Sequence, residues 1–164
     1  MNWDLITNII LITAIAILGI MALLGAYQWT TRGSIKKVDR HLLAMIPPLV
    51  MMLIIYIFFD KFLILATRPD GSGESSFPST HVMAVATIFA MVAISLPRYI
   101  KSKNLRVTLD AVMAILTLLT AIGRIMAGKH WPTDVLGALI FAAAFACIYY
   151  WLLKKFSHRK EQNG

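Results

Sequence analysis

Hydrophobic residues along the chain gather into five long runs that are separated by short polar stretches. The runs cover about residues 5–27, 42–66, 80–97, 107–122 and 133–153. Because a bilayer core about 30 Å thick needs roughly 20 helical residues, these lengths predict membrane-spanning helices. The fourth run is short, and we expect the side chains of Arg124 and Lys129 or a locally thinned bilayer to complete its span. The chain is therefore predicted to be an all-α, polytopic membrane bundle of about five transmembrane helices, with residues 1–164 forming a single domain.

Composition and local features refine this prediction. The chain is 59% hydrophobic and 15% charged, which is unlike a soluble domain. The first run carries Asp4 and lacks a basic region before it, so we do not interpret it as a signal peptide. Pro47 and Pro48 are expected to kink the second helix or to delay its start. The lone Cys147 excludes an internal disulfide and is expected to be a packing residue.

The fifth run contains alanines at four-residue spacing, at positions 138, 142 and 146. Such a face lets another helix approach closely, and ordinary alanine filling of an apolar helix explains it equally well. The sequence is compatible with both interpretations.

Positive charges are distributed in alternation between the runs. Twelve of the 16 Lys and Arg residues lie between the first two runs, between the third and fourth, or after the fifth. By the positive-inside rule these loops are cytoplasmic, which predicts an outside N-terminus and an inside C-terminus. The net charge of +8 is then explained by membrane topology, and we expect no nucleic acid partner.

The predicted outer side carries three polar stretches, of which the first contains Lys61 and Arg68. These residues are seven apart, so on a continued second helix they share a face, and Pro69 then ends that helix. The alternative is that both long cations simply reach toward water from a helix end.

The second stretch is Pro78-Ser79-Thr80-His81, which opens the third run. The first amides of a helix have no acceptor within the helix and its dipole is positive there, so this start can bind an anion. The alternative is that Ser79 or Thr80 is an ordinary N-cap.

The third stretch holds Arg124, His130 and Asp134. Because His130 and Asp134 are four apart at a helix start, the carboxylate can reach the imidazole, fix its tautomer and stabilise its positive form. An imidazole oriented in this way is a nucleophile or a base. The alternative is an interfacial histidine beside a helix-terminal acid. Two histidines and one carboxylate could also bind a metal, but three nearby cations would repel it and would instead hold a tetrahedral anion. We expect neither a metal nor another cofactor.

Together the three stretches resemble the signature of the type 2 phosphatidic acid phosphatase family of integral membrane lipid phosphatases. They read Lys61 to Arg68-Pro69, then Pro78-Ser79-Thr80-His81, then Gly123-Arg124 to His130 to Asp134, and the spacings fit. Thr80 stands where the family has glycine, and Gly123 stands where it has serine. Members of that family usually have six spans, so five here imply either that one N-terminal helix is absent or that the second run hides a further element.

The resemblance implies a role for each of these residues. His130 would attack phosphorus to form a phosphohistidine, with Asp134 orienting it, while His81 would protonate the leaving oxygen and then activate water. The phosphate oxygens would be held by Lys61, Arg68, Arg124 and the amides near Ser79 and Thr80. We expect a bell-shaped pH profile, although the direction in which the pKa of His130 shifts does not follow from the sequence.

The resemblance also implies a partner and a place for the chain. The partner is a membrane lipid bearing a phosphate or diphosphate, bound at the outer face of a bacterial cell membrane. Undecaprenyl diphosphate and phosphatidylglycerol phosphate are the first candidates, and a lipid A phosphatase or a lipid phosphotransferase is the alternative. A non-enzymatic phosphate carrier would need ionisable residues through the membrane, and the spans offer only scattered Thr and Ser.

Overall fold

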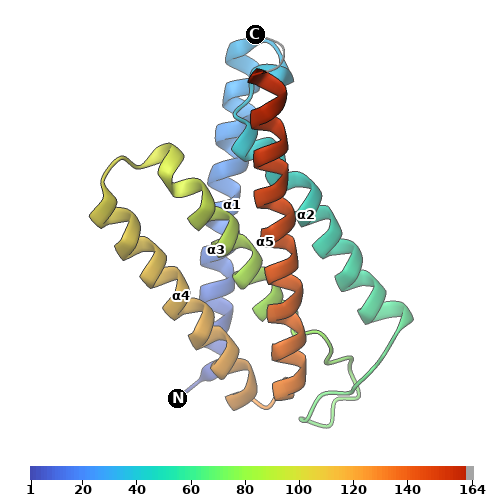
Figure 1. The fold of residues 1–164 in the computed structure, drawn as a ribbon. Helices are drawn as coiled ribbons and strands as arrows, with labels where there is room; N and C mark the ends of the chain where they lie inside the picture. The colour runs from blue at the N-terminus through green and yellow to red at the C-terminus, as the bar shows by residue number, and fades with distance from the viewer. Residues whose placement is uncertain (162–164) are drawn as a thin grey trace.

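The structure, a computed structural model, describes residues 1–161 and consists mainly of five long helices (Figure 1). They are α1 (Trp3–Arg32), α2 (Arg40–Ile57), α3 (Thr80–Tyr99), α4 (Lys103–Met126) and α5 (Pro132–Glu161), with a 3-10 turn η1 (Ile35–Lys37) and a π turn η2 (Phe58–Phe62). Five helices are long and apolar enough to cross a membrane. The prediction of an all-α membrane bundle is confirmed.

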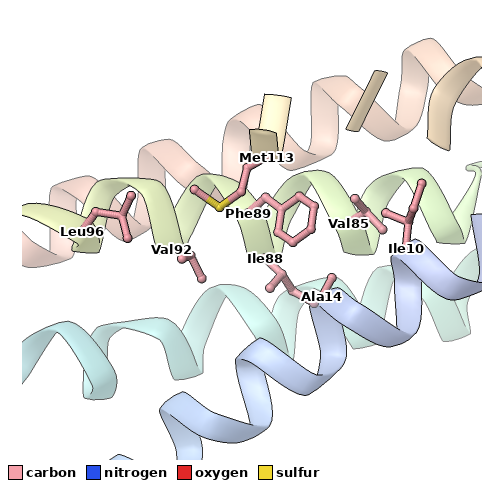
Figure 2. Packing of buried hydrophobic residues seen from close by; sticks show 8 residues of the cluster. All are labelled: Ile10, Ala14, Val85, Ile88, Phe89, Val92, Leu96 and Met113. Atoms are coloured by element: carbon pink, nitrogen blue, oxygen red, sulfur yellow. The ribbon is translucent and has the colours of Figure 1, made fainter. Parts of the chain in front are cut away.

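Helix α3 lies at the centre of the bundle and contacts α1, α2, α4 and α5. One core cluster joins three helices: Ile10 and Ala14 of α1 and Met113 of α4 pack against the α3 residues Val85, Ile88, Phe89, Val92 and Leu96 (Figure 2). A bilayer provides little hydrophobic force between helices, so close van der Waals packing of this kind keeps them together. The cluster holds α1 beside α3 and so places the first turns of α1 near the start of α3.

One expectation about a helix end is wrong. The second helix was expected to run to residue 66, but α2 ends at Ile57 and the π turn η2 closes with the amide of Leu63 donating to the carbonyl of Phe58, at 3.1 Å. The chain then turns into an irregular hairpin, where Ser76 donates its amide to the carbonyl of Ala66. The fourth helix, α4, extends about a turn beyond the expected apolar run at each end.

Smaller expectations have mixed outcomes. The start of α2 is not delayed by Pro47 and Pro48, because the Asp39 carboxylate caps the helix at Arg40 and both prolines lie inside it. The close approach at Ala138 is confirmed, since this residue is fully buried in a cluster with Val82 and Met83 of α3. Cys147 was expected to pack inside the bundle but lies exposed on α5.

The two ends of the bundle differ in what they gather. The start of α1, the start of α3, the end of α4 and the start of α5 lie together at one end, and the hairpin between η2 and α3 lies beside them (Figure 1). These are the segments that carry the three polar stretches. The end of α1 and the start of α2 lie at the opposite end, with the C-terminal part of α5.

Candidate active site

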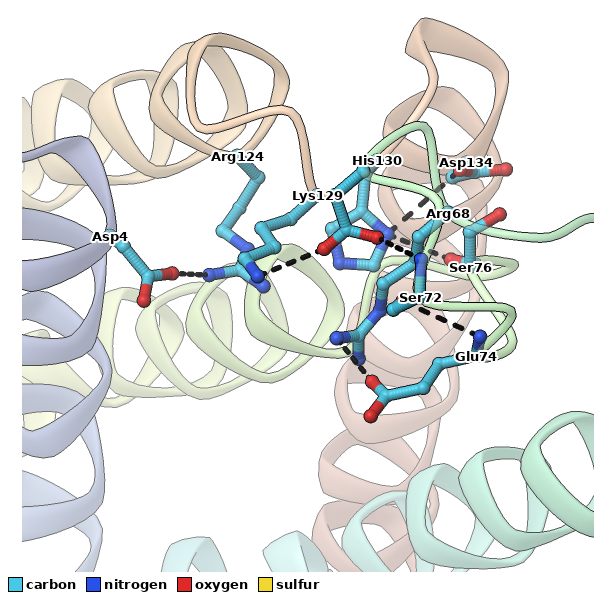
Figure 3. A network of polar contacts seen from close by, with 10 residues as sticks. Asp4, Arg68, Ser72, Glu74, Ser76, Arg124, Lys129, His130 and Asp134 are labelled. Atoms are coloured by element: carbon cyan, nitrogen blue, oxygen red, sulfur yellow. Dashed lines mark hydrogen bonds and ion pairs between the residues drawn. The ribbon is translucent and has the colours of Figure 1, made fainter.

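His130 is the buried centre of a polar cluster at the first of these ends (Figure 3). It lies two residues before the start of α5, and only 3% of its surface is exposed. Its Nδ1 lies 2.8 Å from the carbonyl oxygen of Ser76. A carbonyl only accepts, so the proton lies on Nδ1 and Nε2 keeps its lone pair. This is the tautomer that a nucleophilic Nε2 requires.

Asp134 holds the site in a different way from the one expected. Its Oδ2 lies 3.9 Å from Nδ1 of His130, which is too long for a hydrogen bond, and accepts instead from the backbone amide of Trp131 at 2.7 Å. Its carbonyl accepts from the amide of Ser79 at 3.2 Å, which ties the start of α3 to that of α5. The expectation that Asp134 fixes the imidazole tautomer is wrong, because Ser76 does so. The carboxylate remains close enough to stabilise positive charge on the ring.

Burial, more than any other cause, lowers the pKa of His130 from 6.5 to about 4, and the positive charges of Arg124 and Arg68 act in the same direction. The hydrogen bond to Ser76 and the charge of Asp70 oppose this shift only in part. His130 is therefore neutral at neutral pH, which answers the question that the sequence left open.

Two arginines flank this imidazole. Arg124 is buried, and its Nη1 donates to Asp4 of α1 at 2.7 Å. Arg68, in the hairpin, forms an ion pair with Glu74 through its Nη1. In both side chains Nε is buried and has no partner in the described part of the chain. Each arginine thus keeps one N–H donor for a further acceptor.

Other polar atoms near His130 share this property. The hydroxyls of Ser76 and Ser79 and Nε2 of His130 are also buried without a hydrogen-bond partner among the described side chains. A buried polar atom left unpaired costs about 1–3 kcal/mol, so a group of them indicates a ligand with several acceptor oxygens.

The start of α3 completes the anion site. Ser79 is its N-cap residue, but its side chain makes no capping hydrogen bond, contrary to the ordinary capping interpretation. The first amides of α3 are therefore left for another acceptor, at the positive end of the helix dipole. Thr80 and His130 both line an adjacent polar cavity of about 70 Å³, together with Arg68 and three aromatic residues, Tyr56, Phe59 and Phe77.

Lys61 is not brought to this cluster. Its side chain is 71% exposed and pairs with the neighbouring Asp60 at 2.8 Å. The seven-residue spacing from Arg68 loses its helical meaning because α2 ends before Lys61. A different lysine, Lys129, lies next to His130 and pairs with Asp70 at 2.9 Å. The hydrogen bonds of Ser72, followed by that of Lys129, lower the pKa of the Asp70 carboxyl.

The second histidine, His81, lies in the first turn of α3, near enough to Arg124, His130 and Asp4 for their charges to act on it. Its Nε2 is 2.8 Å from Oδ1 of Asn8 on α1. Sequence reasoning missed Asn8. The available signal was a carboxamide in the first turns of an otherwise apolar run, one helical turn after Asp4.

The glycine before Arg124 has a packing explanation. A Cβ at Gly123 would lie 2.6 Å from Cγ2 of Thr7 and 3.3 Å from Cε3 of Trp3. Helix α1 occupies this space, so a serine, which the related motif has here, would displace α1.

A family model described as the PAP2 superfamily matches residues 58–157. A lipid A 1-phosphatase from Rhizobium johnstonii is 36% identical over 77 residues, which are 47% of this chain and 28% of that protein. The chain thus aligns with less than a third of the length of this curated relative. The fold is similar to the crystal structure of a transmembrane PAP2-type phosphatidylglycerolphosphate phosphatase from Bacillus subtilis, with a TM-score of 0.66, 20% identity and coverage of 96% of this chain and 77% of that one.

Proposed function

Because the chain belongs to the PAP2 superfamily, we propose that it is a metal-independent phosphatase that hydrolyses a lipid phosphate or diphosphate at the extracytoplasmic membrane face. One observation carries the proposal: a neutral, buried imidazole presents an Nε2 that no described residue pairs, between two arginines that each keep a buried N–H donor. A nucleophile surrounded by donors is suited to attack on a tetrahedral oxyanion.

The reaction has two steps. In the first, Nε2 of His130 attacks phosphorus, the N–P bond forms and the bond to the lipid oxygen breaks, while His81 gives that oxygen a proton. In the second, His81 takes a proton from water as the water oxygen binds phosphorus and the N–P bond breaks. Phosphate leaves and both imidazoles return to their starting states.

The surrounding charges stabilise the transition state of each step. Arg68, Arg124 and the first amides of α3 hold the three equatorial oxygens, on which charge is redistributed. Asp134, at 3.9 Å from Nδ1, stabilises the positive charge that His130 acquires when it binds phosphorus. Removing one such donor from a catalytic site costs about 10²–10³-fold in rate.

A lipid substrate fits the position of the site. The polar cavity lies at one end of the membrane-spanning helices, and three of its walls are the aromatic side chains of Tyr56, Phe59 and Phe77. A phosphate at this level leaves the lipid tail beside the helices. Undecaprenyl diphosphate and phosphatidylglycerol phosphate are our first candidates. The 1-phosphate of lipid A is the second, favoured by the 36% identity with a lipid A 1-phosphatase.

Phosphate release by the purified protein, with a chelator present, tests this function. The panel contains polyprenyl diphosphate, phosphatidylglycerol phosphate and lipid A. We expect activity without added metal on at least one of these lipids, loss of that activity in His130→Ala, and acid-labile labelled phosphate trapped on the wild-type protein. His41→Asn is the matched control, because His41 lies at the start of α2, at the opposite end of the bundle. Lipid phosphatase turnover by His130→Ala would refute the proposal.

A further inference from the structure

The start of α1 packs directly onto the candidate active site, although α1 lies outside the residues 58–157 that the family model matches. Thr7 is fully buried, and Trp3 and Thr7 approach Gly123 on α4. Asp4 and Asn8 are four apart and therefore share one face of the helix. On that face Asp4 contacts Arg124, and Asn8 contacts His81.

The contact between Asn8 and His81 determines which ring nitrogen is free. Oδ1 of Asn8 accepts hydrogen bonds and cannot donate one, so Nε2 of His81, at 2.8 Å, carries a proton. The described residues form no hydrogen bond with Nδ1 of His81 that would commit it elsewhere. Nδ1 is then the nitrogen through which His81 can exchange a proton with a ligand.

We propose that Asn8 is a positioning residue, which holds the proton of His81 on Nε2 so that Nδ1 serves as the acid and base of the reaction. This inference rests on the proposed function. In the first step the Nδ1 proton passes to the lipid oxygen as the P–O bond breaks, and in the second Nδ1 takes a proton from water. The Nε2 proton stays with Asn8 throughout.

An amide suits this role better than a carboxylate. Like the aspartate of a His–Asp pair, it fixes the orientation and tautomer of the imidazole. Unlike an aspartate, it adds no negative charge, so it does not favour the imidazolium that must release its proton. The carboxylate of Asp4, one turn earlier, forms an ion pair with Arg124 at 2.7 Å.

The competing explanation is that the bond between Asn8 and His81 only holds α1 against α3. Asn8→Leu, which has a side chain of similar size, removes this hydrogen bond whichever explanation holds. They differ in which substrates are affected. A proton donor matters for an alkoxide leaving group and matters little for a nitrophenolate, which leaves without protonation. A helix that is merely loosened impairs both substrates alike.

The experiment compares kcat/KM on two phosphate monoesters. One is the ester of a long-chain alcohol, and the other is the ester of a nitrophenol whose ring carries the same alkyl chain. For Asn8→Leu we expect a loss of about 10- to 100-fold on the alkyl phosphate and less than about threefold on the nitrophenyl phosphate. Asn8→Asp keeps the accepting oxygen but adds a negative charge, so its activity on the alkyl phosphate should exceed that of Asn8→Leu and stay below that of the wild type. Thr13→Val is the matched control, since Thr13 is exposed on α1 and its hydroxyl donates to the carbonyl of Ile9 within the same helix.

The outcomes distinguish failure of the role of Asn8 from failure of the proposed phosphatase function. Equal losses on both substrates, or no loss on either, would overturn the role of Asn8, and a lowered Tm with equal losses would assign it to helix packing. If His130→Ala is inactive in the same assays, the proposed function stands even where the Asn8 variants overturn the role of Asn8. If His130→Ala retains turnover, the proposed function fails, and the role of Asn8 fails with it.

Discussion

Nδ1 of His130 donates to the carbonyl oxygen of Ser76 at 2.8 Å, while the carboxylate of Asp134 lies 3.9 Å away. The backbone of the hairpin therefore orients the imidazole, and the acid four residues later caps α5 and contributes charge. In a His–Asp pair the carboxylate commonly both orients the imidazole and stabilises its positive charge. Here the carbonyl of Ser76 orients the ring, and the carboxylate of Asp134 supplies the charge.

His130 should titrate far below an ordinary histidine. Its pKa is lowered to about 4 by burial and by the neighbouring arginines, so the ring stays neutral down to about pH 5. An NMR titration of protein with labelled histidine measures this, and the spectrum of His130→Ala assigns the signal. A His130 signal that titrates near 6.5 would contradict the prediction.

The same shift makes the protein less stable in acid. Because the pKa of His130 is lower in the folded state than in the unfolded state, protonation favours the unfolded state. This contribution to stability is fully present above about pH 6.5 and is lost as the pH falls toward about 4. The acid sensitivity of Tm should therefore be smaller in His130→Ala than in the wild type.

Asp134→Asn should impair catalysis more than stability. The amide oxygen can still accept from the Trp131 amide, and Ser76 still orients His130, so Tm should change little. The lost charge is worth up to about 4 kcal/mol at this distance, and we expect kcat to fall by about 100- to 1000-fold. Asp134→Ala should in addition lose about 1 kcal/mol of stability with the cap. Wild-type kcat in Asp134→Asn would show that the carboxylate charge is not used.

Arg68 should matter more than Lys61. Arg68 keeps a buried Nε near His130 that has no partner in residues 1–161, whereas the Lys61 side chain is exposed and pairs with Asp60. We expect kcat to fall by about 10²–10³-fold in Arg68→Ala and by at least about tenfold less in Lys61→Ala. Steady-state kinetics on the preferred lipid measure both. Equal losses would place Lys61 at the phosphate after all.

The contact between Gly123 and Thr7 should appear as an energetic coupling. Gly123→Ala brings a Cβ to 2.6 Å from Cγ2 of Thr7 and should destabilise the protein by about 1–3 kcal/mol. Thr7→Ser removes that methyl group and keeps the hydroxyl bonded to the carbonyl of Asp4. In a double-mutant cycle Thr7→Ser should recover most of the loss. Additive effects on the free energy of unfolding would show that α1 does not pack here in solution.

The candidate active site should face outside the cytoplasm. After Cys147→Ser, a cysteine at Ser72 in the hairpin should react with a membrane-impermeant maleimide in intact cells. A cysteine at Lys103, which is exposed at the start of α4, should react only after permeabilisation. The opposite pattern would reverse the orientation inferred from the positive charges.

The amino-acid sequence by itself determined the number of helices and most of the polar residues that meet at the candidate active site. A chain in lipid must satisfy its backbone hydrogen bonds within each helix, so hydropathy alone locates the spans. The spacing of the three polar stretches then identified Arg68, His81, Arg124, His130 and Asp134, which the structure gathers at one end of the bundle.

Only the tertiary structure decided how these groups are held. The bond from His130 to Ser76 joins residues 54 apart, that from His81 to Asn8 joins residues 73 apart, and that from Arg124 to Asp4 joins residues 120 apart. No local periodicity encodes such pairs, because they depend on how α1 and the hairpin pack against α3, α4 and α5. The exclusion of Lys61 has a similar cause, since the point at which α2 ends is set by the π turn and the hairpin rather than by hydropathy.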